Sequence, residues 1–131
     1  MQAVSAVLVS ALLAAGTPTV ISGVTKRPEH VGQCFDTRVV SVGTRLGYGQ
    51  GRDDPGSGSA ITLADGHSNV SYEQLPGIDQ SRPGDRVRLC VIRLPEDCPK
   101  GDTRGITYRG ANLRTGLSWK ASDFQHGCGG G

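Results

Sequence analysis

Short runs of alternating apolar and polar residues, separated by turns rich in Gly, Pro and Asp, make up most of the chain beyond residue 25. The clearest run is RVRLCVIRL at 86–94, where apolar positions from Val87 to Val91 alternate with Arg86 and Arg88. A period of two residues is typical of a β-strand with one face buried. Residues 86–94 are therefore predicted to form a strand.

The other runs predict one long strand and two hairpins. Residues 33–46 are rich in β-branched side chains and alternate imperfectly, which predicts a long strand with a bulge. In the first hairpin we expect Ile61 and Leu63 to face Val70 and Tyr72 at a period of two. No helical period of useful length follows residue 25. The hairpins pair 60–64 with 70–75 across a turn at 65–69, and 106–111 with 117–121 across a turn at 112–116.

Five or six short strands in about a hundred residues favour a closed barrel, because closure leaves no sheet edge unpaired. The prediction is an all-β, antiparallel, OB-like barrel of five to six strands stabilised by disulfides, with a small open β-sandwich as the alternative. Composition agrees: 20 Gly in 131 residues and 5% aromatic residues suit a turn-rich β protein better than a helical bundle.

The Gly-rich, polar stretch GYGQGRDDPGSGS at 47–59 has no periodicity and predicts a mobile surface loop. Its glycines are followed neither by Lys-Ser/Thr nor by a helical pattern. The stretch is therefore not interpreted as a phosphate-binding loop.

The first 25 residues contain no charged side chain, and the apolar run Ala3–Ala15 has the length of a signal-peptide core rather than of a membrane span. We expect 1–25 to be a signal peptide cleaved between about residues 15 and 25, and 26–131 to be a single domain in the periplasm or medium, without a membrane span. The alternative is a buried N-terminal helix or strand of the domain.

Four cysteines lie beyond the leader, and an even number in a small exported domain predicts two disulfides. The alternative, a zinc site, lacks the usual C-x-x-C spacing. No metal and no cofactor are expected. The cysteines are Cys34, Cys90, Cys98 and Cys128.

Hairpin geometry selects one of the three pairings that four cysteines allow. If the last two strands turn around Arg114 and Thr115, residue 128 returns to the neighbourhood of residue 101, close to Cys98. Cys34 and Cys90 then remain, on two strands that are neighbours in an OB-like barrel. The predicted bonds are Cys34–Cys90 and Cys98–Cys128.

The C-terminal half, GDRVRLCVIRLPEDCPKGDTRG, YRGANLRTGLSW and DFQHGCGG, resembles small exported bacterial proteins of unassigned function with the same pattern. The resemblance covers Gly84 to Gly130, with a weaker match at GQCFDTR. In such proteins the four Cys positions recur. The resemblance therefore implies structural cysteines and an exported location, and it implies no activity.

A row of cations on the second half of the chain, with two interleaved aromatic residues, is the strongest functional signal. Arginine and aromatic side chains anchor many binding surfaces. The net charge of +2 and the few aromatic residues do not point to nucleic acid. The residues are Arg86, Arg88, Arg93, Arg104, Arg109, Arg114, Lys120, Tyr108 and Trp119.

The hypothesis is a non-catalytic binding module of the bacterial envelope, protein-binding or inhibitory, with an Arg/Trp face for an acidic envelope protein or a polyanion. The alternative without a binding role is that these cations lie on an ordinary solvent-exposed strand face and that Trp119 lies in the core.

The alternative function is a small hydrolase or metal-dependent enzyme with a site near His126 and Asp123. A Cys–His nucleophile is disfavoured, because Cys128 is expected in a disulfide. His30 and His67 lie in predicted loops at separations that suggest no common metal. We expect no catalytic residue, and include His126 only as a candidate for binding.

Overall fold

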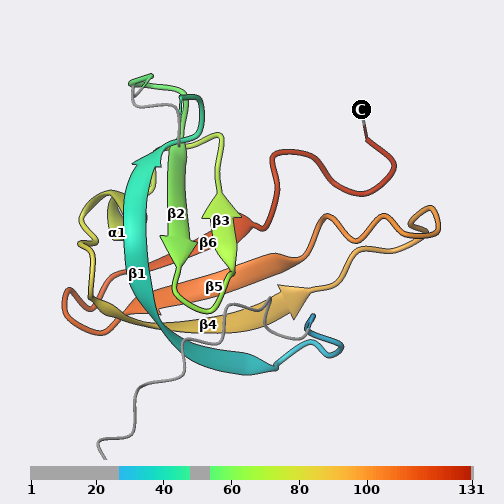
Figure 1. Cartoon of the computed structure of the whole chain (residues 1–131), viewed down its shortest axis with the longest axis horizontal. Coiled ribbons are helices and arrows are strands. Elements are labelled where there is room, and N and C mark those ends of the chain that lie inside the picture. Colours follow the sequence, from blue (N-terminus) through green and yellow to red (C-terminus); the bar gives the residue numbers. More distant parts are fainter. Residues whose placement is uncertain (1–26, 48–53, 131) are drawn as a thin grey trace, which may run out of the picture.

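In the part of the chain that the computed structural model describes, residues 27–47 and 54–130, six strands form one sheet that closes on itself as a barrel (Figure 1). Going around the barrel, the strand order is β1-β2-β3-β6-β5-β4, and β4 pairs again with β1. Every pairing is antiparallel. The elements are β1 Cys34–Thr44, β2 Ser59–Leu63, β3 Ser68–Val70, α1 Pro76–Asp79, β4 Arg86–Arg93, β5 Thr107–Asn112 and β6 Ser118–Ser122.

Closure confirms the predicted barrel over the open sandwich. The long first strand makes closure possible, because Cys34–Arg38 pair with β4 and Val39–Thr44 pair with β2. The register shifts between Val39 and Ser41, which is the expected bulge and lets β1 bend from one neighbour to the other. Figure 1 shows this curvature along β1.

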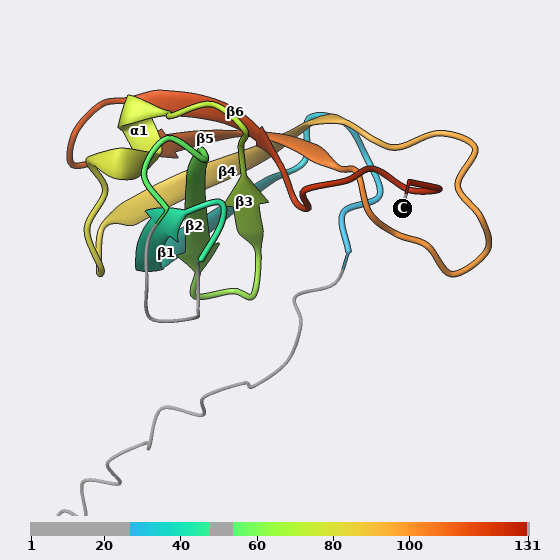
Figure 2. The ribbon, with the colours of Figure 1, turned by 90° about the horizontal axis from the view of Figure 1, so that it is seen from above.

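The interior is filled by alternate residues of every long strand. Val87, Leu89 and Val91 of β4 are buried, as the alternation predicted. The short helix α1 covers one end of the barrel, where Ile78 is fully buried and the helix packs against β1, β2 and β6. The loop between β4 and β5 and the C-terminal tail extend from the opposite end (Figure 2). The other core side chains are Val39, Ile61, Leu63, Ile106, Tyr108, Trp119 and Ala121.

The first hairpin is shorter than predicted, and the inward position on its second strand was assigned wrongly. The N–H of Leu63 donates to the carbonyl of His67 (2.8 Å), so the turn is 64–66, with Gly66 at φ 91°. Asn69, rather than Val70, therefore points inward, opposite Ile61. Tyr72 lies beyond the strand and is exposed.

Both predicted disulfides are present. Cys34 and Cys90 are direct partners across β1 and β4, with a Cα–Cα distance of 4.0 Å. Thr107 pairs with Ser122 and Ala111 with Ser118, which centres the last hairpin on Arg114 and Thr115. Cys98 and Cys128 are bonded, as expected from this register, with a Cα–Cα distance of 5.3 Å. Two disulfides are typical of proteins that fold in an oxidising environment outside the cytoplasm.

The expected signal peptide, residues 1–25, lies outside the described residues, as do residues 48–53 of the expected mobile loop. The rest of that loop is bonded to the end of β1 and to the residues just after it, because the N–H of Asp54 donates to the Thr44 hydroxyl and the Ser57 hydroxyl accepts from the N–H of Leu46. Among residues 27–47 and 54–130, no helix has the length and apolarity needed to cross a bilayer.

Candidate functional site

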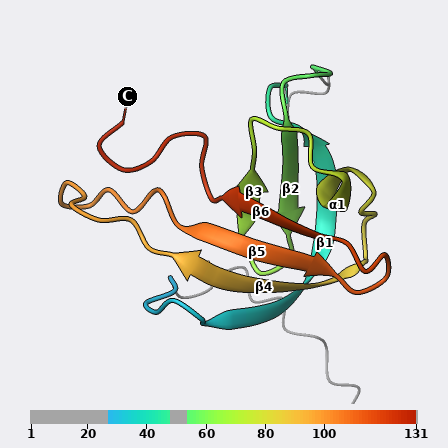
Figure 3. The ribbon, with the colours of Figure 1, turned by 180° about the vertical axis from the view of Figure 1, so that it is seen from behind.

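Four of the predicted cations share one outer face of the barrel. Arg86 and Arg88 on β4, Arg109 on β5 and Lys120 on β6 are exposed because they alternate with buried residues on each strand. These three strands lie side by side (Figure 3). The barrel thus collects on one surface side chains that are up to 34 residues apart in sequence.

A fifth cation comes from β1. Arg38 is exposed and is the direct partner of Arg86 across β1 and β4. The alternation in 33–46 could have placed it on the outer face, had the neighbouring strand been known. We call Arg38, Arg86, Arg88, Arg109 and Lys120 the cationic face.

Like charges face each other twice within this set. Arg38 pairs with Arg86, and Arg109 with Lys120, whereas Asp36 opposite Arg88 is the acidic partner. Directly opposed like charges destabilise an antiparallel sheet. Arg38 donates to the carbonyl of Gly84 (3.0 Å). Within the described part of the chain, the other four side chains form no hydrogen bond or ion pair.

Arg114 does not join this face, because it is bound at the α1 end of the barrel. Its Nε lies 2.7 Å from Asp85 Oδ1, and its other nitrogen donates to Asp85 Oδ2 and to the carbonyl of Gln80. Asn112 also donates to Asp85 (2.9 Å). The Arg114 hydrogen bond and then that of Asn112 hold the pKa of Asp85 far below its usual range, although burial opposes them. Arg114 is therefore a structural cation.

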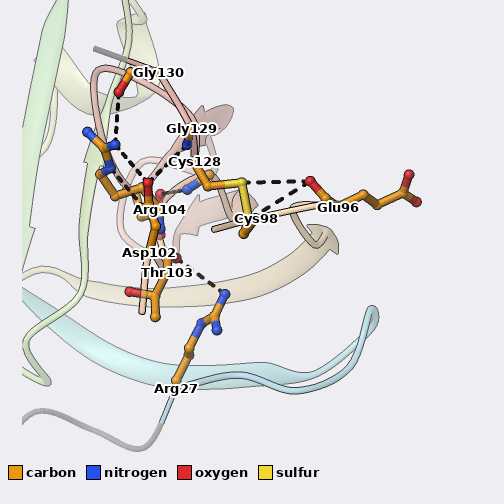
Figure 4. Close-up of a disulfide and its surroundings, with 11 residues drawn as sticks. Arg27, Glu96, Cys98, Asp102, Thr103, Arg104, Cys128, Gly129 and Gly130 are labelled. Atoms are coloured by element: carbon orange, nitrogen blue, oxygen red, sulfur yellow. Dashed lines mark hydrogen bonds and ion pairs between the residues drawn. A yellow bond between two sulfur atoms is a disulfide. The ribbon is translucent and has the colours of Figure 1, made fainter. Parts of the chain in front are cut away.

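Arg104 belongs to a second structural cluster, around the C-terminal disulfide (Figure 4). It makes a two-pronged contact with Asp102 (3.0 and 2.9 Å) and donates to the carbonyl of Gly130. The Arg104 hydrogen bond, followed by that from the N–H of Gly129, holds the pKa of Asp102 far below its usual range. These bonds and Cys98–Cys128 fix the tail against the β4–β5 loop. Arg93 ends β4, where it pairs with Thr107 of β5.

Neither aromatic residue of the predicted Arg/Trp face is on the surface. Trp119 is 4% exposed, and its Nε1 donates to Asn69 Oδ1 (2.9 Å) inside the barrel. Tyr108 is also buried. Both residues lie at inward positions of their strands, so the interpretation of Trp119 as a core side chain holds and the outer face is cationic without aromatic anchors.

The structure does not bring Asp123 and His126 together in one site. Asp123 lines a cavity with His67, whereas His126 is exposed in the tail and is not part of the lining. The histidine that shares this cavity with the expected acid is therefore the one in the β2–β3 turn. Its pairing with Asp65, two residues earlier in Asp65-Gly66-His67, could have been suspected from the sequence, but its position beside Asp123 depends on the closed barrel.

Comparison of the chain with protein-family models, with curated proteins and with solved structures gives no match. The resemblance to small exported bacterial proteins therefore stays a prediction, and the functional argument depends on the geometry alone.

Proposed function

We propose that this chain is an exported, non-catalytic binding module of the bacterial envelope, located in the periplasm or secreted, and that the cationic face binds an acidic surface of a partner protein. The apolar leader and the two disulfides support export.

The pairing of like charges carries this proposal. Two like-charge pairs, Arg38 with Arg86 and Arg109 with Lys120, lower the stability of the barrel. A folded protein keeps such unfavourable pairs where function requires them. A partner with carboxylates would relieve both repulsions. Electrostatic complementarity of this kind gives specificity and fast association.

The apolar surroundings favour a protein over a polyanionic polymer. Leu113, which follows β5 and bonds to Arg86 through the backbone, is 55% exposed, and Val40 at the bulge of β1 is also exposed. Protein interfaces combine arginine with apolar contacts.

The test uses the purified, disulfide-bonded domain to capture partners from envelope extract, followed by affinity measurement with the captured protein. Replacing Arg88 and Arg109 by Ala should weaken binding at least about tenfold, and affinity should fall as salt is added. Lys100→Ala is the matched control, because Lys100 is exposed in the β4–β5 loop. Equal losses in both variants, or binding that salt does not change, would refute the cationic face as the interface; capture by heparin beads alone would point to a polymer.

A further inference from the structure

A cavity of about 330 Å³ opens between the β2–β3 turn, the loop before β5 and the segment that follows β6. Its size lies at the lower end of the range of small-molecule sites. Its polar side chains include His67, Tyr108 and Asp123, which come from three different parts of the fold, and Ile106 and the half-exposed Phe124 supply apolar surface. This cavity is separate from the cationic face.

His67 presents one ring nitrogen as a hydrogen-bond acceptor. Its Nδ1 lies 2.8 Å from Asp65 Oδ2, and a proton on Nδ1 suits this contact with a carboxylate. Nε2 has no partner among the described residues, and with the proton on Nδ1 it is an acceptor. The ring is held between Phe35, 4.9 Å away, and Tyr108, 5.6 Å away, measured between centroids.

Tyr108 is a buried residue on the cavity wall whose hydroxyl is open to a ligand. The residue is 1% exposed and lines the cavity, yet its hydroxyl forms no hydrogen bond with residues 27–47 or 54–130. Because Tyr108 lines the cavity, solvent or a bound molecule can satisfy this hydroxyl there. A hydroxyl at a cavity wall without a protein partner is therefore suited to a bound molecule.

Asp123 adds a carboxylate to the same wall. Its Oδ1 accepts the N–H of Gly105 (2.8 Å), whereas Oδ2 forms no hydrogen bond with the described residues. The local field is negative: besides burial, Asp123 and Asp65 raise the pKa of Tyr108 more than Arg27 lowers it. Arg27 also lines the cavity, and its guanidinium donates to the carbonyl of Thr103 (3.3 Å; Figure 4).

We propose that this cavity binds a primary ammonium group. An ammonium has three N–H donors and no acceptor, and three residues of the wall, Asp123, His67 and Tyr108, each carry an acceptor atom without a hydrogen-bond partner among the described residues. Its charge matches the negative field. A neutral polyol would gain the hydrogen bonds without the charge interaction, and an anion would be repelled by the carboxylate of Asp123 on the wall.

The first experiment titrates the full disulfide-bonded chain with butylammonium and follows backbone amide shifts by NMR. Saturable shifts are expected at residues 66–68, 106–108 and 123–124. Tetramethylammonium, which has the charge but no N–H donor, and 1-butanol, which has no charge, should bind at least about tenfold more weakly. Equal binding of 1-butanol, or no saturable shift with butylammonium, would overturn the proposal.

Variants locate the site. Tyr108→Phe removes only the hydroxyl, which has no partner among the described residues, so the fold should be kept while butylammonium binding weakens. Asp123→Asn keeps an oxygen for the N–H of Gly105 and removes the charge, and should weaken binding at least about tenfold. Asp36→Asn makes the same charge change on the outer surface and should leave binding unchanged. Equal losses for Asp36→Asn and Asp123→Asn would overturn the site.

Two further probes distinguish the source of the ammonium. A peptide with an internal lysine and blocked termini presents the group on a side chain, and free cadaverine presents it on a small molecule. Tighter binding of the peptide than of butylammonium supports a lysine of a protein partner, and tighter binding of cadaverine supports a diffusible amine. Failure of both to displace butylammonium would contradict a single ammonium site.

Discussion

Trp119 shows how a single side chain can organise the interior of a small barrel. The residue opposite it on β5 is Gly110, and a Cβ atom built on Gly110 would collide with the indole ring. On the α1 side, a Cβ atom on Gly77 would lie 3.1 Å from the same ring. The two glycines leave the space that the indole fills, and Asn69 accepts its N–H (2.9 Å). A buried indole thus has both its packing and its hydrogen bond satisfied.

Gly110→Ala should destabilise the protein by about 1–3 kcal/mol, because the added methyl group must displace the Trp119 ring or the β5 backbone. Denaturant unfolding followed by tryptophan fluorescence measures the change. Gly127→Ala is the control, since nothing lies within 4 Å of its added Cβ. A loss in Gly127→Ala as large as that in Gly110→Ala would show that steric contact with Trp119 is not the cause.

At the scale of elements, Asp85 joins the turn before β4 to the end of the last hairpin. It accepts from the N–H of Arg82 (2.8 Å), from Asn112 and from Arg114, and Asn112 also donates to Ser81 just beyond α1. These bonds connect the α1 end of the barrel to β4 and β5. All of these donors favour the ionised form of the Asp85 carboxylate.

Because the pKa of Asp85 in the folded protein is below the ordinary 3.8, ionised Asp85 stabilises the fold above that pH. This stability should be lost as the pH falls below 3.8 toward the folded-state pKa. Asp85→Asn should be less stable at neutral pH and should lack this acid-dependent loss, as measured by thermal melts across the pH range. Asp36→Asn makes the same change at an exposed position of β1 and serves as the control. If it removes the same loss of stability in acid, Asp85 is not the group responsible.

The cross-strand cations can be tested without the partner. Lys120→Glu converts the repulsive pair with Arg109 into an attractive one, so the domain should become more stable by about 0.5 kcal/mol while binding of the acidic partner is lost. Chemical unfolding and affinity measurement give the two readouts. Lys100→Glu changes the same charge outside the paired strands and should do neither. A less stable Lys120→Glu domain would contradict the argument from like-charge pairs.

Most of the elements could be predicted because they depend on local patterns: alternation located β4, β-branched residues and irregular alternation located the bulged β1, and the turn at Arg114 set the register of the last hairpin. The error in β3 has a local cause as well. A three-residue turn at 64–66 replaces the longer turn expected, and a shift of one residue exchanges the faces of a strand. The inward Asn69 and the pairing of Arg38 with Arg86 depend on neighbours distant in sequence, so no local pattern predicts them.

At the scale of the whole molecule, the two disulfides fasten different parts of the barrel. Cys34–Cys90 joins β1 to β4, the pair of strands that closes the sheet, and spans a separation of 56 residues. Cys98–Cys128 spans 30 residues at the far end and holds the tail, which Asp102 also binds through the N–H of Gly129 (2.9 Å). The tail begins at the cavity residues Asp123 and Phe124. Barrel closure and cavity geometry are thus secured by separate bonds.

Replacing Cys34 and Cys90 together by Ser should lower the free energy of unfolding by about 4 kcal/mol, the value that loop entropy gives for this separation. Replacing Cys98 and Cys128 by Ser should lower the free energy of unfolding by less than the roughly 3.5 kcal/mol that loop entropy gives. The released tail gains freedom in the folded state as well, which offsets part of the entropy gained by the unfolded chain. Guanidinium unfolding measures both. In the variant without Cys98–Cys128, amide hydrogen exchange should become faster only in the tail and the β4–β5 loop, while the strand amides stay protected. Butylammonium binding should also weaken in this variant. A second variant that loses protection throughout the barrel, or costs more than the first, would contradict this division between the two bonds.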